Sequence, residues 1–186
     1  MARIPNLTER EEVPDELVDA FDRVAALRNG AVSGPYGVLL HSPEVAVRGA
    51  ALGSFVRFES DLTPQQRETA VMTVARELDA AVMWAGHVFL ARQAEVREQV
   101  IEVIQHRRLL DGLEPEEVEI ITFVRELFST NRVSPGAFAA VHDRLGDAST
   151  VDLTGLVGYY GFVGAVLNAF EIEPPEGAPR LPAITN

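Results

Sequence analysis

Serine or threonine is followed by proline at three places in the chain, Ser42-Pro43, Thr63-Pro64 and Ser134-Pro135. Such pairs are typical of helix N-termini, because the hydroxyl caps free backbone N–H groups and proline suits the first turn. Gln66, three residues after Thr63, completes the pattern of a capping box. The intervening segments repeat apolar residues at helical spacing, and none alternates as a strand would. The sequence therefore predicts an all-α fold, with helices over residues 14–28, 43–58, 63–78, 80–94, 96–109, 115–129, 134–145 and 149–170.

The length of 186 residues suits a single domain with a proper core. We divide it into an N-terminal helix and loop over residues 1–35, a helical domain over 36–170 and a proline-rich C-terminal arm over 171–186. Residues 29–37 are rich in glycine and predict a loop, and Asp79 is expected to cap the helix after it. The broad apolar helix faces of a chain of 186 residues have to be buried somewhere.

The formal net charge is −12, and the arginines are scattered among acidic residues. Nucleic acid and anionic membranes both need a basic surface, so neither is expected as a partner. The most apolar stretch, residues 151–170, contains Asp152, Thr154 and Asn168, which argue against a membrane span. Its four glycines recur every third residue, which indicates close approach of another helix or of a ligand. We expect a cytoplasmic protein.

Two residue types are missing from the chain. The absence of cysteine excludes disulfides, thiolate metal sites and thiol redox catalysis. All sixteen basic residues are arginine, so a lysine Schiff base is excluded as well. No metal-ligand spacing, phosphate loop or dinucleotide motif is present, and neither a metal nor a cofactor is expected.

His87 and Glu68 are the candidates for proton chemistry. On a helix, Met83 and Trp84 lie four and three residues before His87 and share its face, which predicts a partly buried imidazole. Glu68 lies in the preceding helix, from which an inward-pointing carboxylate could orient the imidazole or relay its proton. A satisfied core histidine and a solvated first-turn acid are the structural alternatives.

The order and spacing of several segments resemble the carboxymuconolactone decarboxylase family, which shares the alkyl hydroperoxidase D-like (AhpD-like) fold. These segments are Leu40-His41-Ser42-Pro43-Glu44, Leu62 to Glu68, Trp84-Ala85-Gly86-His87, and Leu156 to Tyr160 with Leu167-Asn168-Ala169. The resemblance covers about residues 36–170. In the peroxidase members a glutamate, a Cys-x-x-Cys pair and a histidine fall on Glu68, on Ala80 and Met83, and on His87. Hydroperoxide reduction through that thiol pair is therefore excluded.

The resemblance implies a cofactor-independent lyase that decarboxylates a small carboxylated or lactone-type metabolite, in a trimer or hexamer. His87 would be the acid/base, Glu68 its partner and Arg76 a bidentate clamp for a substrate carboxylate. Further residues expected to line the pocket are Trp84, Met83, His41 and Tyr160. An inter-helix ion pair of Arg76 and a core position of Tyr160 are the structural alternatives.

Two other functional interpretations stay open. Met83 stands where cysteine-free relatives carry a glutamate, which favours a non-catalytic protein of the same fold that binds a small ligand or acts as a scaffold. A peroxidase-like description by homology would need thiols that the chain lacks. A pocket on which Glu68 and His87 converge would favour the enzyme, and a site filled by side chains would favour the scaffold.

Overall fold

The computed structural model describes residues 2–184, and within that range the regular elements are all helical. The all-α prediction is thus confirmed. Residues 1, 185 and 186, the ends of the expected N-terminal segment and C-terminal arm, lie outside the described residues. The helices are α1 (Val18–Leu27), α2 (Tyr36–Leu39), α3 (Pro43–Ser54), α4 (Pro64–Glu77), α5 (Ala81–Gln93), α6 (Glu98–Gln105), α7 (Pro115–Thr130) and α8 (Pro135–Ala169). The 3₁₀ turns η1 (Arg10–Glu12) and η2 (Asp15–Leu17) precede α1, and the π-helical segment η3 (Phe55–Glu59) follows α3.

The helix starts predicted at Thr63 and Ser134 are confirmed for α4 and α8. The Thr63 hydroxyl accepts from the Gln66 backbone N–H at 3.2 Å, and the Gln66 side chain accepts from the Thr63 N–H at 2.8 Å. At α8 the Ser134 hydroxyl accepts from the Ala137 backbone N–H at 3.3 Å. Asp79 does not cap α5, and that prediction was wrong. Its φ of 49° turns the chain between α4 and α5, and its carboxylate accepts from Arg76 instead.

Three helix boundaries differ from those predicted from the sequence. The expected loop 29–37 ends early, because α2 begins at Tyr36. The helix expected over 43–58 widens into the π-helical η3 at Phe55. The two helices expected over 134–145 and 149–170 run together as α8, with a kink at Gly146 (φ 73°, ψ 178°). Glycine permits this left-handed backbone at no steric cost.

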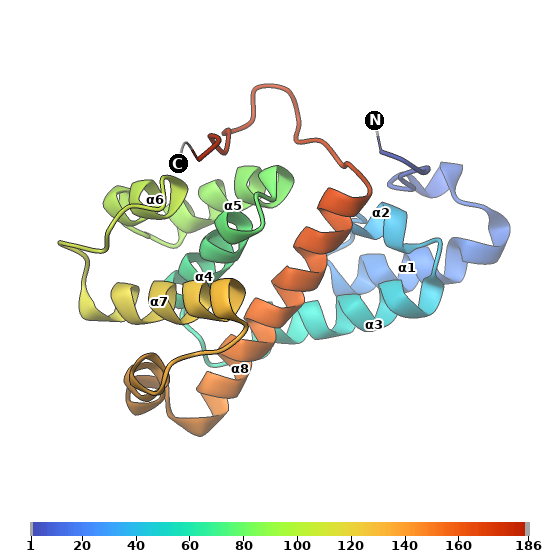
Figure 1. The fold of residues 1–186 in the computed structure, drawn as a ribbon. Helices are drawn as coiled ribbons and strands as arrows, with labels where there is room; N and C mark the ends of the chain where they lie inside the picture. Colours follow the sequence, from blue (N-terminus) through green and yellow to red (C-terminus); the bar gives the residue numbers. More distant parts are fainter. Residues whose placement is uncertain (1, 185–186) are drawn as a thin grey trace.

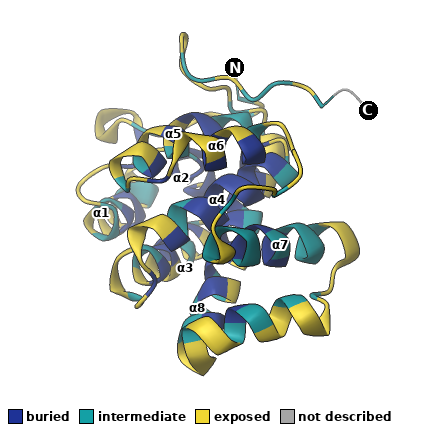
Figure 2. Cartoon of the chain, turned by 90° about the vertical axis from the view of Figure 1, so that its left-hand side faces the viewer, coloured by how far each residue is buried: buried dark blue, intermediate teal, exposed yellow. Residues whose placement is uncertain are grey.

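α4 is the centre of the larger of two apolar clusters and packs against α5, α6, α7 and α8 (Figures 1 and 2). The smaller cluster joins the N-terminal segment to α1, α2 and α3. α8 crosses between the two groups of helices (Figure 1) and contributes residues to both clusters. The smaller cluster includes residues on both sides of position 35, so the packing is continuous across the expected boundary there.

α8 is the one helix among residues 2–184 that is long and apolar enough to cross a membrane. Its most apolar window is 56% buried inside the protein, as in the core helix of a globular fold. Two of its glycines permit close packing. A Cβ on Gly164 would lie 2.6 Å from Leu78 Cδ1, and one on Gly161 would lie 3.4 Å from the Phe128 ring. A Cβ on Gly158 would have no atom within 4 Å, so helix packing explains only part of the row of glycines along α8.

Candidate functional site

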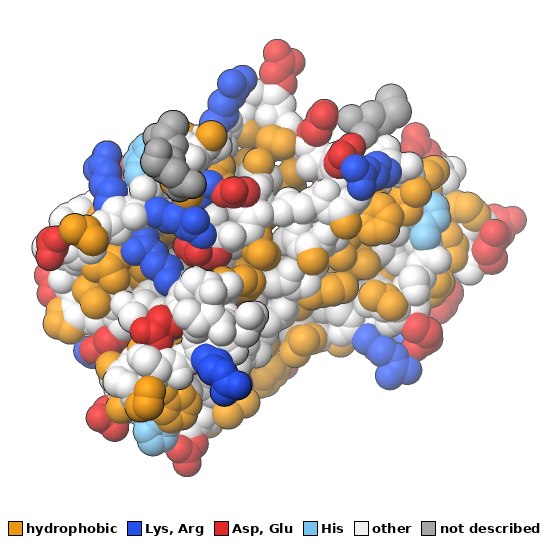
Figure 3. Space-filling view, in the orientation of Figure 1, with side chains coloured by type: hydrophobic (Ala, Val, Ile, Leu, Met, Phe, Trp, Pro, Cys, Tyr) orange, Lys and Arg blue, Asp and Glu red, His pale blue; other side chains and the backbone are white. Residues whose placement is uncertain are grey.

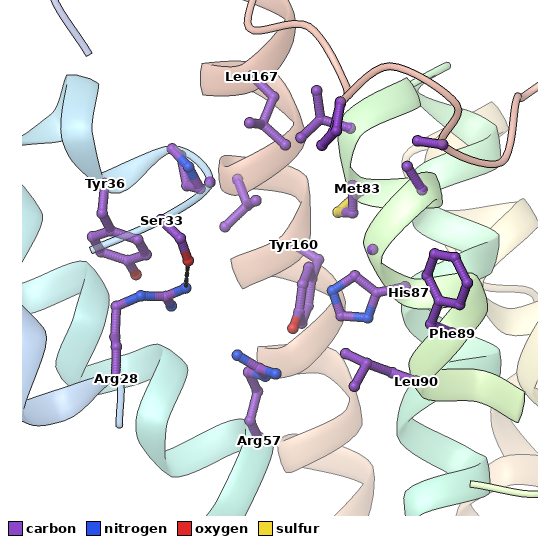
Figure 4. Close-up of a pocket in the computed structure, with 18 of the residues that line it drawn as sticks. Arg28, Ser33, Tyr36, Arg57, Met83, His87, Phe89, Leu90, Tyr160 and Leu167 are labelled. Atoms are coloured by element: carbon purple, nitrogen blue, oxygen red, sulfur yellow. Dashed lines mark hydrogen bonds between the residues drawn. The ribbon is translucent and has the colours of Figure 1, made fainter. Parts of the chain in front are cut away.

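A cavity of about 640 Å³ lies where α5 and α8 face the end of α1 and the loop that leads to α2 (Figure 4). This volume is typical of small-molecule sites. Its polar groups include His87 from α5, Tyr160 from α8, Arg28 from the end of α1 and Arg57 from η3. The lining also contains the hydroxyls of Ser33, Tyr36 and Tyr159 and one carboxylate, Glu176. Its apolar walls come from α5 and α8, and residues 175–178 of the C-terminal arm close one side.

His87 and Glu68 meet because α4 and α5 pack side by side. Nδ1 of His87 lies 2.7 Å from Oε2 of Glu68, and the two side chains are 12% and 13% exposed. Since a carboxylate only accepts hydrogen bonds, Nδ1 carries the proton in this pair. Nε2 of His87 has no hydrogen-bond partner among the described residues, and the imidazole lines the cavity. The geometry fixes one tautomer and leaves the other nitrogen available.

Tyr160 stands edge-on to the imidazole, with ring centroids 5.0 Å apart and an interplanar angle of 89°. Burial raises the pKa of the Tyr160 hydroxyl well above its usual range, and the positive charge of Arg57 opposes that rise. The hydroxyl is therefore a neutral hydrogen-bond donor at physiological pH. Tyr36 and Tyr159 line the same cavity, and their hydroxyls lie 2.8 Å apart and bond each other.

Arg28 and Arg57 are functional candidates that the sequence did not single out. Neither forms an ion pair with a carboxylate of the described residues. The Arg28 guanidinium lies 4.2 Å above the Tyr36 ring, and its buried Nε has no hydrogen-bond partner. Arg57 lies 4.8 Å from the Phe58 ring and extends toward Tyr160 (Figure 4). Arg28 also donates to the Ser33 hydroxyl at 3.5 Å. The lining thus contains two guanidinium groups that form no ion pair and one carboxylate, Glu176, and this excess of positive charge makes the cavity suited to an anion.

The structure brings only part of the predicted set to this cavity. Met83 and Tyr160 line it together with His87. Trp84 is 1% exposed and belongs to the larger apolar cluster instead. His41 is exposed, and its Nε2 lies 2.9 Å from the Pro5 carbonyl oxygen, away from the cavity lining. The pocket roles expected for Trp84 and His41 therefore have no support in the geometry.

Arg76 is not placed to clamp a substrate. Its side chain is 2% exposed and bonds the backbone carbonyl oxygens of Gln105 and Pro182, together with the Asp79 carboxylate. Arg76 lies eight residues after Glu68 on α4, about 12 Å farther along the helix axis. The expected clamp is corrected accordingly, and the structural alternative of an ion pair fits Arg76 better.

Glu68 does not line the larger cavity but borders a second, smaller one of about 250 Å³, together with Arg57, Arg67 and Tyr160. The Glu68–His87 pair thus separates two hollows, with the imidazole facing the larger one. Within residues 2–184, no three histidine, aspartate or glutamate side chains are grouped so that they could hold a metal ion. The chemistry that the site offers rests on a carboxylate–imidazole pair, a neutral phenol and two guanidinium groups that form no ion pair with a described carboxylate.

No protein-family model matches this chain, and no curated protein matches it. Among solved structures it is similar to a protein of unknown function from Agrobacterium tumefaciens, described as a candidate antioxidant defence protein AhpD. The two are 17% identical with a TM-score of 0.65, and the match covers 74% of this chain and 95% of that chain. A likeness at that identity is a likeness of fold. This chain therefore has the AhpD-like fold.

Proposed function

We propose that this protein is a cofactor-independent lyase that decarboxylates a small carboxylated or lactone-type metabolite by acid/base chemistry. The observation that carries the proposal is the Glu68–His87 pair at the wall of a cavity that also holds two unpaired arginines. Arg57 and Arg28 take over the anion-binding role that the sequence suggested for Arg76. Tyr160 supplies a neutral hydroxyl beside the imidazole.

In this reaction the carbon–carbon bond to the carboxylate breaks, CO₂ leaves, and the bonding electron pair stays on the substrate as an enolate. The positive charge of Arg57 and the Tyr160 hydroxyl stabilise that developing negative charge. In this step His87 is the imidazolium, with a second proton taken up from solvent on Nε2 and with Glu68 stabilising the charge from the Nδ1 side. It delivers the Nε2 proton to the carbanionic carbon and returns to the neutral form protonated at Nδ1. The imidazole regains its proton from water, so that each turnover consumes one proton and releases one CO₂.

The proposal is tested with a panel of small lactone and β-keto carboxylic acids, by following CO₂ release. We expect His87→Gln to abolish turnover of the acid that the wild-type protein decarboxylates, while the circular-dichroism spectrum and melting temperature are retained. His106→Gln is the matched control, because His106 is exposed at the end of α6 and does not line the cavity. Equal turnover by His87→Gln and the wild type would sink the assignment.

A binding protein without catalysis is the second candidate. The apolar side chains around His87 favour it, with Met83 in place of a polar residue and Leu90, Val163 and Leu167 on the same walls. This candidate predicts that acids bind with an affinity that depends on Arg57 and are recovered unchanged. A panel in which binding is measurable and no CO₂ is released would select it over the lyase.

A further inference from the structure

The C-terminal arm is fixed at both of its ends. At its start, the backbone N–H of Arg3 donates to the Phe170 carbonyl at 2.9 Å, and Nη1 of Arg3 donates to the Ala169 carbonyl at 2.9 Å. At its far end, Nη1 of Arg76 donates to the Pro182 carbonyl at 2.7 Å. Nε2 of Gln105 donates to the Arg180 carbonyl at 3.0 Å. The arm is therefore a strap with two anchors.

The middle of this strap forms one side of the cavity. Pro175, Glu176, Gly177 and Ala178 all belong to its lining, and Figure 1 shows the segment arching from the end of α8 toward α5 and α6. Four prolines between residues 174 and 182 restrict its backbone. A restricted chain that is anchored at both ends loses little further entropy when it holds one position over a ligand.

Arg76 and the strap depend on each other energetically. The arginine is 2% exposed, and the Pro182 carbonyl is the contact that it makes outside the α4–α6 region. A buried guanidinium that loses an acceptor keeps the desolvation penalty without its compensation. Leu181 packs against the larger apolar cluster next to this contact, so polar and apolar contacts hold the same end of the strap.

We propose that Arg76 is a positioning residue, which holds the strap of residues 173–182 as a wall of the ligand site. The inference rests on the proposed function for the identity of the site, and it assigns the strap a part in retaining a small carboxylate. With the strap in place, water is kept from the apolar walls, and the guanidinium groups of Arg28 and Arg57 act in a less polar surrounding. Release of its far end opens the cavity beside Met83 and Leu167.

The first experiment follows the strap itself. Arg180 is the single basic residue after Arg144, so trypsin cleavage between Arg180 and Leu181 reports how often the far end opens. We expect Arg76→Met to raise the cleavage rate at this bond about tenfold, because a buried charge-assisted hydrogen bond is lost. Arg76→Lys should restore part of the protection. Arg92→Met is the control, since Arg92 pairs with Glu98 on the surface and does not contact the strap.

Gln105→Ala provides a second test that leaves Arg76 paired, and it should raise the same cleavage rate by a smaller factor. If Arg76→Met fails to fold, this variant still decides the matter. A cleavage rate at Arg180 that is unchanged in Gln105→Ala and in every folded Arg76 variant would contradict the proposed anchor.

The second experiment measures the site, with 2-naphthoate as a fluorescent carboxylate probe. Arg76→Met and Leu181→Ser should each weaken its binding about five- to tenfold, and the double variant should bind no more weakly than either single variant. Additive losses would show that Arg76 does not act through the strap. Arg57→Met separates the strap proposal from the proposed function. If this variant binds 2-naphthoate as the wild type does, the assignment of the anion site is wrong, whereas the trypsin result for the strap still stands.

Discussion

At the scale of single side chains, the groups around the cavity have incomplete sets of partners. Nε2 of His87 and Nε of Arg28 lack hydrogen-bond partners in the part of the chain that the structure describes. Arg57 lacks a counter-ion within the same residues. Of these groups only Nε of Arg28 is a fully buried atom, but all three residues line the same hollow, where a bound molecule would complete their interactions.

The tautomer of His87 can be predicted without a substrate. Because Glu68 accepts from Nδ1, neutral His87 should be protonated at Nδ1 in the wild-type protein. Glu68→Ala removes this acceptor and should shift the population toward the Nε2-protonated form. Nitrogen-15 spectra of the four histidine side chains, with His87→Gln for assignment, distinguish the two forms. An identical His87 spectrum in Glu68→Ala would contradict the hydrogen bond.

Tyr160 gives a prediction for alkaline pH. Burial raises the pKa of its hydroxyl above the value in the unfolded chain, which is about 10. Below pH 10 both states hold the proton. Above it, the unfolded chain loses the proton first, so the free energy of unfolding should fall as pH rises. Urea unfolding at pH 8 to 11 should show a shallower fall for Tyr160→Phe than for the wild type, and parallel curves would refute the prediction.

At the scale of helices, a feature could be predicted from the sequence where the residues that form it lie close together in the chain. The capping box of Thr63 and Gln66 uses residues three apart and could be predicted. Glu68 and His87 lie on two successive helices, and their residue types left structural alternatives open, so the pair was singled out through the family resemblance. Arg28 and Arg57 reach the cavity from α1 and η3, whose approach depends on tertiary packing. No spacing in the sequence marked them among sixteen arginines.

Two errors of the sequence analysis have a common geometric cause. Residues eight apart on a helix differ by about 80° in direction as well as in height, so Arg76 cannot share the face of Glu68. Trp84 differs from His87 by about 60°, which turns its ring into the core while Met83 stays at the cavity. A helical stripe is wide enough to contain both a cavity face and a core face, and the sequence alone does not separate them.

Gly53 and Gly158 offer a matched pair of substitutions in helices. A Cβ on Gly53 of α3 would lie 2.3 Å from the Tyr159 hydroxyl oxygen and 2.5 Å from its Cζ, and that rigid ring is held by Tyr36. Gly53→Ala should therefore lower the free energy of unfolding by about 1–3 kcal/mol. Gly158→Ala meets nothing within 4 Å in α8 and should raise it by about 0.5–1 kcal/mol. Chemical denaturation of both variants measures the difference, and destabilisation of equal size would contradict the packing described for Tyr159.

At the scale of the whole molecule, the net charge and the exposed apolar surface give different information about partners. Acidic and basic side chains both occur on the face shown in Figure 3, and the net charge of −12 disfavours the binding of nucleic acid. Apolar side chains nevertheless reach the surface. Around the kink of α8, Phe138 is 48% and Val151 is 69% exposed, and both line a shallow, mostly apolar depression. Exposed apolar surface of this kind is typical of a subunit contact.

We therefore expect a homo-oligomer, with a mass three or six times that of the 20.3 kDa chain in light scattering coupled to gel filtration. Val151→Arg should lower this mass, because a guanidinium would have to be buried without a partner in the contact. Leu109→Arg is the control, since Leu109 is 81% exposed in the segment between α6 and α7 and lies outside the depression. A monomeric wild-type protein would rule out the oligomer. Dissociation by Leu109→Arg alone would place the contact at the segment between α6 and α7 instead of at α8.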